Sequence, residues 1–144
     1  MKVHGSCHCG AITYEAVIDP QMAGICHCAD CQTFSGAPFR AVVPTKAEDF
    51  VLGGTPRIYV KVAQSGRRRA QAFCGECGAS IYSADAEGPS LYNLRLGSLR
   101  ERAQIPACKQ VWRTSALEWA QNVSLLPVAP QSELVEPEKR GNDQ

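Results

Sequence analysis

The distribution of cysteine constrains the fold of this chain more than any other feature. Eight cysteines occur among its 144 residues, and seven of them fall into closely spaced sets: Cys7 and Cys9, Cys26, Cys28 and Cys31, and Cys74 and Cys77. In a reducing cytoplasm, dense cysteines more often bind metal or act in catalysis than form disulfides. Two sets contain C-x-x-C, whose ends seldom close a relaxed disulfide but readily direct two sulfurs at one ion. The spacing therefore predicts metal binding.

The remaining composition indicates one globular domain. The chain is 44% hydrophobic, which is enough for a core, and its net charge of +1 argues against nucleic acid as a partner. No apolar run approaches the roughly 18 residues of a membrane span, and the first residues lack the apolar segment of a secretory signal. We therefore expect a cytoplasmic protein without a membrane partner. Its single zinc-binding domain covers residues 1–126, and a flexible tail without a functional site covers residues 127–144.

Short apolar segments between glycines and prolines predict a mainly antiparallel β domain. Strands are expected over residues 11–18, 24–26, 39–43, 57–62, 69–74, 79–82, 91–96 and 110–112. Residues 29–34 can form one helical turn. The capping-box pattern of residues 45–48 predicts another, after Pro44 ends the preceding strand.

The grouped cysteines divide into a set of four and a set of three. The first set, here called the four-cysteine group, fits a tetrahedral Zn²⁺ site with four sulfur ligands: Cys7, Cys9, Cys74 and Cys77. Such an ion would join the first strand to a distant hairpin and stabilise a small β core. A glycine follows each cysteine pair, at Gly10 and Gly78, and permits a tight turn that directs backbone amides at the thiolates.

The second set, here called the three-cysteine group, lies within one short segment: Cys26, Cys28 and Cys31. Three thiolates on Zn²⁺ give a net charge of about −1 and leave one coordination position free, as in a catalytic site. The metal can then lower the pKa of a water or thiol that takes this position.

The spacing leaves two other interpretations of the three-cysteine group open. In one, a second structural zinc is completed by His27, His8 or Cys108, although His27 is awkwardly placed between two ligating cysteines. In the other, Cys28 and Cys31 form a redox pair without metal. No long helical pattern follows them, as a thioredoxin-like unit would need.

Three segments together resemble the glutathione-dependent formaldehyde-activating family, which is similar to centromere protein V and has an antiparallel β-tent, Mss4-like fold. These segments are Gly5–Gly10, Cys26–Cys31 running into Ser35–Gly36, and Phe73–Gly78. The resemblance covers roughly residues 3 to 119. It implies two zinc ions per chain, a structural one in the four-cysteine group and a catalytic one in the three-cysteine group.

The activity implied by the resemblance is that of a carbon–sulfur lyase acting on a thiol–aldehyde adduct. In the family this is the reversible formation of S-hydroxymethylglutathione from formaldehyde and glutathione, so a small thiol such as glutathione is the expected partner. Residues 106–119 fit the family pattern loosely, with Lys109 and Gln110 where a histidine often stands. The alternatives are a non-enzymatic zinc-stabilised module that binds protein or nucleic acid, and a metal-free redox or formaldehyde-scavenging protein.

Arginines outside the cysteine groups are candidates for holding an anionic substrate. The run 67–69 is either a solvated loop tip, a clamp for the carboxylates of glutathione, or, more weakly, a nucleic-acid contact. Arg40 and Arg95 fall on predicted strands and reach substrate if they face the three-cysteine group. Trp112 and Trp119 are expected to pack in the core or at a sheet edge.

Polar residues beside the cysteines can orient the metal ligands without binding the metal themselves. None of them is singled out as a general acid or base. These residues are His8, His27, Asp30 and Glu76. The segment 34–36 directly follows the three-cysteine group and is a candidate pocket wall.

Overall fold

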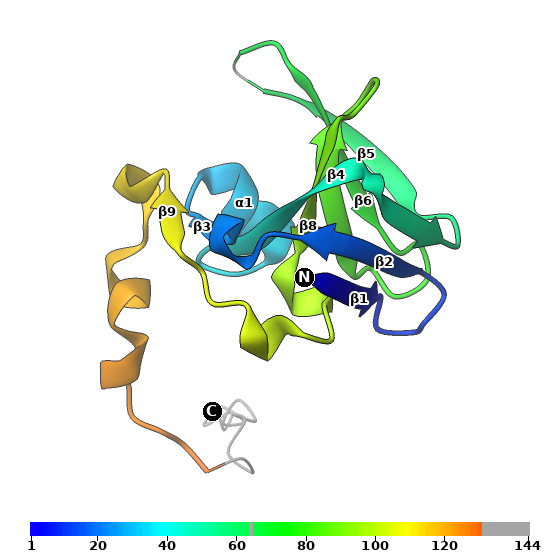
Figure 1. Ribbon diagram of the computed structural model, residues 1–144. Helices are drawn as coiled ribbons and strands as arrows, with labels where there is room; N and C mark the ends of the chain where they lie inside the picture. The colour runs from blue at the N-terminus through cyan, green and yellow to red at the C-terminus, as the bar shows by residue number, and fades with distance from the viewer. Residues whose placement is uncertain (64, 131–144) are drawn as a thin grey trace, which may run out of the picture.

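A computed structural model describes residues 1–63 and 65–130 of the chain (Figure 1). Within these ranges the strands join one sheet: β1 (Lys2–Ser6), β2 (Thr13–Ile18), β3 (Gly24–Cys26), β4 (Arg40–Gly53), β5 (Arg57–Val62), β6 (Arg68–Phe73), β7 (Ser80–Asp85), β8 (Leu91–Arg95) and β9 (Lys109–Val111). The α-helix is α1 (Ala29–Ser35). Short 3₁₀ segments are η1 (Pro20–Met22), η2 (Leu96–Ser98), η3 (Arg102–Gln104), η4 (Arg113–Ser115) and η5 (Glu118–Leu125).

The long strand β4 organises the sheet. The main strand order is β1-β2-β4-β8-β7-β6-β5, and every neighbouring pair is antiparallel. One edge of β4 pairs first with β3 and then with β2, while the other edge pairs with β8. Strand β9 adds to β3 in parallel. This arrangement fixes β3, and with it the start of the three-cysteine group, directly to the central strand.

Alternating side chains build the core on one face of the sheet. Strand β2 shows the pattern most clearly, because Tyr14, Ala16 and Ile18 are buried while the residues between them are exposed. Large side chains that are fully buried come from five different segments: Val3, Val43, Ile81, Leu94 and Leu99. A cluster of aromatic rings with centroids 4.7–5.7 Å apart extends this core: Tyr14, Phe50, Tyr82 and Tyr92.

The predicted mainly antiparallel β fold is confirmed, with one error in the middle of the chain. Strands β3 and β5 begin and end where the sequence pattern places them, and α1 takes the predicted helical position. The helical turn predicted after Pro44 is wrong, because β4 continues through Pro44 to Gly53. The Thr45 hydroxyl does not cap a helix. It donates across the sheet to the carbonyl oxygen of Val17 at 2.7 Å, beside a register shift in β2.

The first strand of the sheet was not predicted. Strand β1 is absent from the sequence predictions, since its five residues include one glycine and few strand-forming side chains.

The C-terminal part of the described chain lies outside the sheet. Figure 1 shows η5 lying away from the sheet, and residues 127–130 after it have no regular structure. The rest of the predicted tail, residues 131–144, lies outside the described residues, so the domain boundary at residue 126 stays a prediction. Among the described helices, none combines the length and apolar character that crossing a bilayer requires.

The close approach of Tyr14 to Gly5 yields a first prediction. The two residues face each other across β1 and β2, and a Cβ atom on Gly5 would lie 2.0 Å from Cζ of the Tyr14 ring. We expect Gly5→Ala to lower the free energy of unfolding by about 1–3 kcal/mol, because the buried ring must move. Gly97→Ala is the matched control, since open space surrounds that position. Urea denaturation measures both, and an equal effect of the two substitutions would contradict the packing argument.

A second prediction concerns acid stability. The Glu101 carboxylate accepts a hydrogen bond from the backbone N–H of His4 at 3.0 Å and lies 2.8 Å from its ring Nδ1. These contacts, the backbone one first, lower the pKa of Glu101. A carboxyl group with a lowered folded-state pKa adds stability above its unfolded pKa, and this stability is lost as the pH falls through the folded value.

Glu101→Gln should therefore reduce stability at neutral pH and weaken the loss of stability between about pH 5 and pH 3. Urea denaturation at several pH values measures this dependence. The exposed Glu48→Gln serves as the control. Identical acid dependence in Glu101→Gln and the wild type would show that the contact with His4 does not matter for stability.

Candidate metal centres

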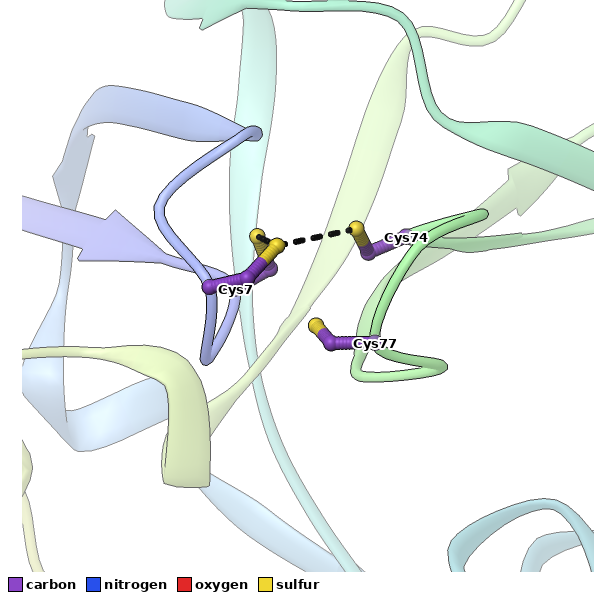
Figure 2. Close-up of side chains that lie close together, drawn as sticks. Cys7, Cys74 and Cys77 are labelled. Carbon is purple, nitrogen blue, oxygen red and sulfur yellow. Dashed lines mark hydrogen bonds between the residues drawn. The ribbon is translucent and has the colours of Figure 1, made fainter.

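Two loops far apart in sequence bring the four-cysteine group together. Cys7 and Cys9 lie in the loop between β1 and β2, and Cys74 and Cys77 lie in the loop between β6 and β7. Figure 2 shows Cys7 facing Cys74 and Cys77 across the space between these loops. All four sulfur atoms lie within 4.8 Å of one another. The group thus links one edge of the sheet to strands near the opposite edge.

The sulfur separations test whether this group suits a metal ion. The Cys7 and Cys9 sulfurs are 3.5 Å apart, and those of Cys9 and Cys74 are 3.7 Å apart. A tetrahedral zinc ion with bonds of about 2.3 Å separates its sulfur ligands by about 3.8 Å. Four thiol donors at this spacing fit such an ion, so the group is able to hold one.

Backbone amides support the sulfurs, as the glycines after each pair predict. Gly10 and Gly78 have φ values of 81° and 74°, in the left-handed region that favours glycine. The Ile12 N–H donates to the Cys7 sulfur at 3.2 Å. Backbone N–H groups, first that of Ala79, also lower the pKa of the Cys77 thiol to about 6. These contacts favour thiolate, which is the form that binds metal.

The three-cysteine group forms where β3 passes into α1. Cys26 ends β3, Cys28 is the N-cap of α1, and Cys31 lies buried in its first turn. The three sulfur atoms lie within 4.8 Å of one another, and the Cys28 sulfur accepts a hydrogen bond from the Cys31 N–H at 3.4 Å. This set also fits a metal ion with three protein ligands.

The charge around this group depends on nearby cations. Burial raises the pKa of the Cys31 thiol to about 12, while the positive charge of Arg40 acts in the opposite direction. A buried thiol of this kind ionises only with a cation close by, and a bound metal deprotonates it outright. The three-cysteine group therefore needs a nearby positive charge for its thiols to ionise.

The residues considered as a fourth protein ligand lie elsewhere. His27 is buried, and its Nε2 atom lies 2.8 Å from Oε1 of Gln110. The exposed Cys108 sulfur lies 3.4 Å from the carbonyl oxygen of Pro106. Within residues 1–63 and 65–130, the ligand atoms gathered at the second site are the three sulfurs alone, without His8, His27 or Cys108. The His27 side chain instead contacts Gln110 of β9.

A cavity of about 310 Å³ opens beside the three-cysteine group. Arg40 lines it, as predicted for a strand residue that faces this group, and Phe34 from the segment 34–36 forms another part of its wall. Asp30, Arg69 and Trp112, which the sequence analysis also considered, lie in the lining as well. The sequence did not single out the rest of the lining: Val42, Lys61, Ala63, Gln71, Ser83 and Asn93. These six residues come from β4 to β8 or, for Ala63, from the end of β5, and only the folded sheet brings them together.

Arg95 is not part of this cavity's lining, but it contacts two residues that are. Its side chain is buried and donates to Gln71 Oε1 at 3.1 Å and to Ser83 Oγ at 3.3 Å. Burial, and then the charge of Arg40, lower the pKa of Arg95 to about 9, so its guanidinium stays charged at neutral pH.

The basic run at residues 67–69 is engaged by acidic side chains. Arg67 and Arg69 both pair with Asp85, at 2.8 Å and 2.7 Å, and Arg68 pairs with Glu87. Of the three, Arg69 reaches the cavity lining. The run therefore has less free positive charge to offer a ligand than its sequence suggests.

The tryptophans were expected to pack in the core or at a sheet edge, and neither lies in the core. Trp112 follows β9, which among the described strands pairs with β3 alone and is thus an edge strand. The exposed fractions of Trp112 and Trp119 are 62% and 59%. Trp112 is also the only non-glycine residue with a positive φ, 57°, among the described residues. It follows β9, which pairs with β3, so its side chain lines the cavity beside the three-cysteine group. Positive φ at a bulky residue is uncommon and often marks a functional site.

The antiparallel sheet and its two sulfur groups define a β protein with two candidate metal centres. The family model described as glutathione-dependent formaldehyde-activating enzyme matches residues 2–115. This match covers most of the chain, which therefore belongs to that family, and the resemblance noted from the three cysteine segments is confirmed.

Individual relatives are similar at lower identity. The chain is 28% identical over 91 residues to the "Uncharacterized lyase" of Schizosaccharomyces pombe, covering 63% of this chain and 64% of that protein. It is 27% identical over 99 residues to the "Putative glutathione-dependent formaldehyde-activating enzyme" of Halomonas elongata, covering 63% and 61%. The chain thus spans less than two thirds of the length of either relative.

A solved structure supports the fold. A crystal structure of a Rhodobacter sphaeroides protein matches with a TM-score of 0.58 and 20% identity, covering 77% of this chain and 100% of that chain. At this identity the likeness shows the fold alone.

The four-cysteine group predicts metal-dependent stability. We expect a strong chelator, or Cys74→Ser, to lower the free energy of unfolding by several kcal/mol, since structural zinc contributes about 10–16 kcal/mol to small zinc domains. Urea denaturation and elemental analysis measure stability and bound metal together. Cys108→Ser is the control, because that sulfur lies outside both groups. Full stability of metal-free protein would contradict a structural role for this group.

Proposed function

We propose that this chain is a zinc-dependent carbon–sulfur lyase that acts on a thiol–aldehyde adduct. The substrate pair that the family suggests is glutathione and formaldehyde, which combine reversibly to S-hydroxymethylglutathione. The observation that carries this proposal is a three-sulfur group beside a cavity lined by cations. The names of the relatives in fission yeast and Halomonas elongata agree with a lyase or formaldehyde-activating role.

The two sulfur groups would hold one zinc ion each, with different roles. The four-cysteine group supplies a complete set of protein ligands and ties distant loops together, which suits a structural ion. The three-cysteine group supplies three ligands, which suits a catalytic ion. There the zinc would act as a Lewis acid that lowers the pKa of a substrate thiol.

The residues of the chain prepare the site for this chemistry. Strand pairing of β3 with β4 and β9, and the N-cap role of Cys28, hold the three sulfurs in position. Phe34 and Trp112 add apolar surface to the cavity wall beside the group. Arg40 adds positive potential, which favours the thiolate and the charge that develops on the aldehyde oxygen as the carbon–sulfur bond forms. The thiol proton ends on that oxygen, which completes the adduct.

The alternative of a nucleic-acid binding module has less support. Its candidate surface was the basic run 67–69, and each of these arginines is paired with an acidic side chain. Such pairing lowers the positive field that draws a phosphate backbone. No described feature favours this alternative over the lyase.

The test combines turnover with metal content. We expect Cys28→Ser with Cys31→Ser to slow adduct exchange at least about 100-fold, since loss of outer partners alone costs 10–100-fold at metal sites. Exchange spectroscopy by nuclear magnetic resonance measures the rate with glutathione and formaldehyde, above the uncatalysed background. Elemental analysis should find two zinc ions in the wild type and one in the double variant.

The control for this experiment is Cys108→Ser, which leaves both groups intact and should keep the wild-type rate. Full activity of the double variant with every thiol–aldehyde pair would remove the three-cysteine group from catalysis. No rate above background in the zinc-loaded wild type with any pair would overturn the lyase proposal.

A further inference from the structure

Two arginines near the three-cysteine group have no carboxylate partner. Arg40 and Arg95 form no ion pair within the described part of the chain, and the Nε atom of each is buried without a hydrogen-bond partner. The exposed fraction of Arg95 is only 6%. Buried charges are costly unless they are paired. Two adjacent guanidinium groups without a carboxylate therefore require an explanation.

Gln71 joins these two arginines and faces the cavity. Arg40 Nη1 and Arg95 Nη2 both donate to the Gln71 Oε1 atom, at 3.0 Å and 3.1 Å. These two donors fix the orientation of the Gln71 amide, because its oxygen accepts hydrogen bonds whereas its NH₂ group only donates them. Within the described residues, the hydrogen bonds of the Gln71 side chain all end on Oε1 and none involves its NH₂ group. Gln71 also lines the cavity. The two arginines thus hold the Gln71 amide with its oxygen toward them, and its NH₂ group is left as a hydrogen-bond donor at the cavity wall.

The other cations in the cavity wall already have carboxylate partners. Lys61 pairs with Asp30, and Arg69 pairs at 2.7 Å with Asp85, a carboxylate that it shares with Arg67. Among the described residues, Arg40 and Arg95 are the cations at this place without such a partner. A divalent ion held by three thiolates carries about −1 and offsets one of these two charges. The other remains for a carboxylate of a ligand.

We propose that Arg40 and Gln71, backed by the buried Arg95, form a subsite for a carboxylate of the substrate. The inference rests on the proposed function and narrows it to thiol substrates that carry a carboxylate within reach of the reacting sulfur. The stacking of the Arg40 guanidinium over the Phe34 ring, 5.9 Å from its centroid, holds the cation at the cavity wall. Guanidinium and amide N–H groups are suitable donors to a carboxylate.

The test compares two small thiols that differ in one group, which is a carboxylate in one and its neutral amide in the other. The probes are 3-mercaptopropionate and its neutral amide, bound to the zinc-loaded full chain and measured by isothermal titration calorimetry. The wild type should prefer the carboxylate, and Arg40→Gln should reduce that preference about tenfold. A loss of thiolate stabilisation in this variant weakens both probes alike and leaves their ratio unchanged. Comparing the ratio between variants cancels the intrinsic difference between the two thiols. Arg68→Gln removes an equal charge away from the cavity and should keep the wild-type ratio.

A second variant covers the case in which Arg40→Gln does not fold. Gln71→Glu places a carboxylate of the protein beside both guanidinium groups. We expect it to raise the free energy of unfolding and to abolish the preference for the carboxylate probe, while the amide still binds. A purely structural role for the arginines predicts the higher stability without the change in preference.

The outcomes separate the two proposals. Binding of both probes, with the same ratio in the wild type, Arg40→Gln and Gln71→Glu, would overturn the carboxylate subsite and leave the lyase proposal standing. Failure of the zinc-loaded wild type to bind either thiol would also overturn the subsite, while the lyase proposal still depends on the exchange rate with glutathione and formaldehyde. A ratio that falls in both variants and persists in Arg68→Gln would support the subsite.

Discussion

The meeting of two distant loops at the four-cysteine group is the constraint on which the rest of the structure depends. In the strand order of the sheet, β1 and β6 are separated by β2, β4, β8 and β7. Strands spaced by about 4.8 Å would place them about 24 Å apart in a flat sheet. The sulfurs of Cys9 and Cys74 nevertheless lie 3.7 Å apart, at the ends of loops that follow these strands. The sheet must therefore curve strongly, and the same curvature gathers β4, β6 and β8 around the cavity.

The two sulfur groups differ in how they depend on the fold. The three-cysteine group lies within six consecutive residues, so a β-strand and one helical turn are enough to gather its sulfurs. The four-cysteine group needs the curved sheet, because its halves are separated by residues 10–73. A metal ion in the first kind of site organises a local segment, whereas an ion in the second kind stabilises the whole tertiary structure.

Sequence reasoning succeeded where the signal is local. Cysteine spacing indicated which sulfurs belong together, and glycine after each pair indicated the left-handed turns at Gly10 and Gly78. It failed where tertiary contacts decide, as at Thr45, whose hydroxyl bonds Val17 instead of capping a helix. Gln71 carried no sequence signal at all, because its importance comes from two arginines on other strands that donate to the same oxygen. The wall formed by Trp112 was missed because an exposed tryptophan is the exception among tryptophans.

The parallel pairing of β9 with β3 separates the task of holding the three-cysteine segment in place from the task of shaping the cavity beside it. Backbone hydrogen bonding, including the His27 N–H to the carbonyl oxygen of Val111 at 3.1 Å, fixes the strand that leads to Trp112. Among the side chains of residues 109–112, that of Gln110 takes part in this fixation, because it lies 2.8 Å from the buried His27 ring. The Trp112 side chain lines the cavity and is not needed to hold the strand. A substitution there would reshape the cavity while the backbone that positions the sulfurs stays in place.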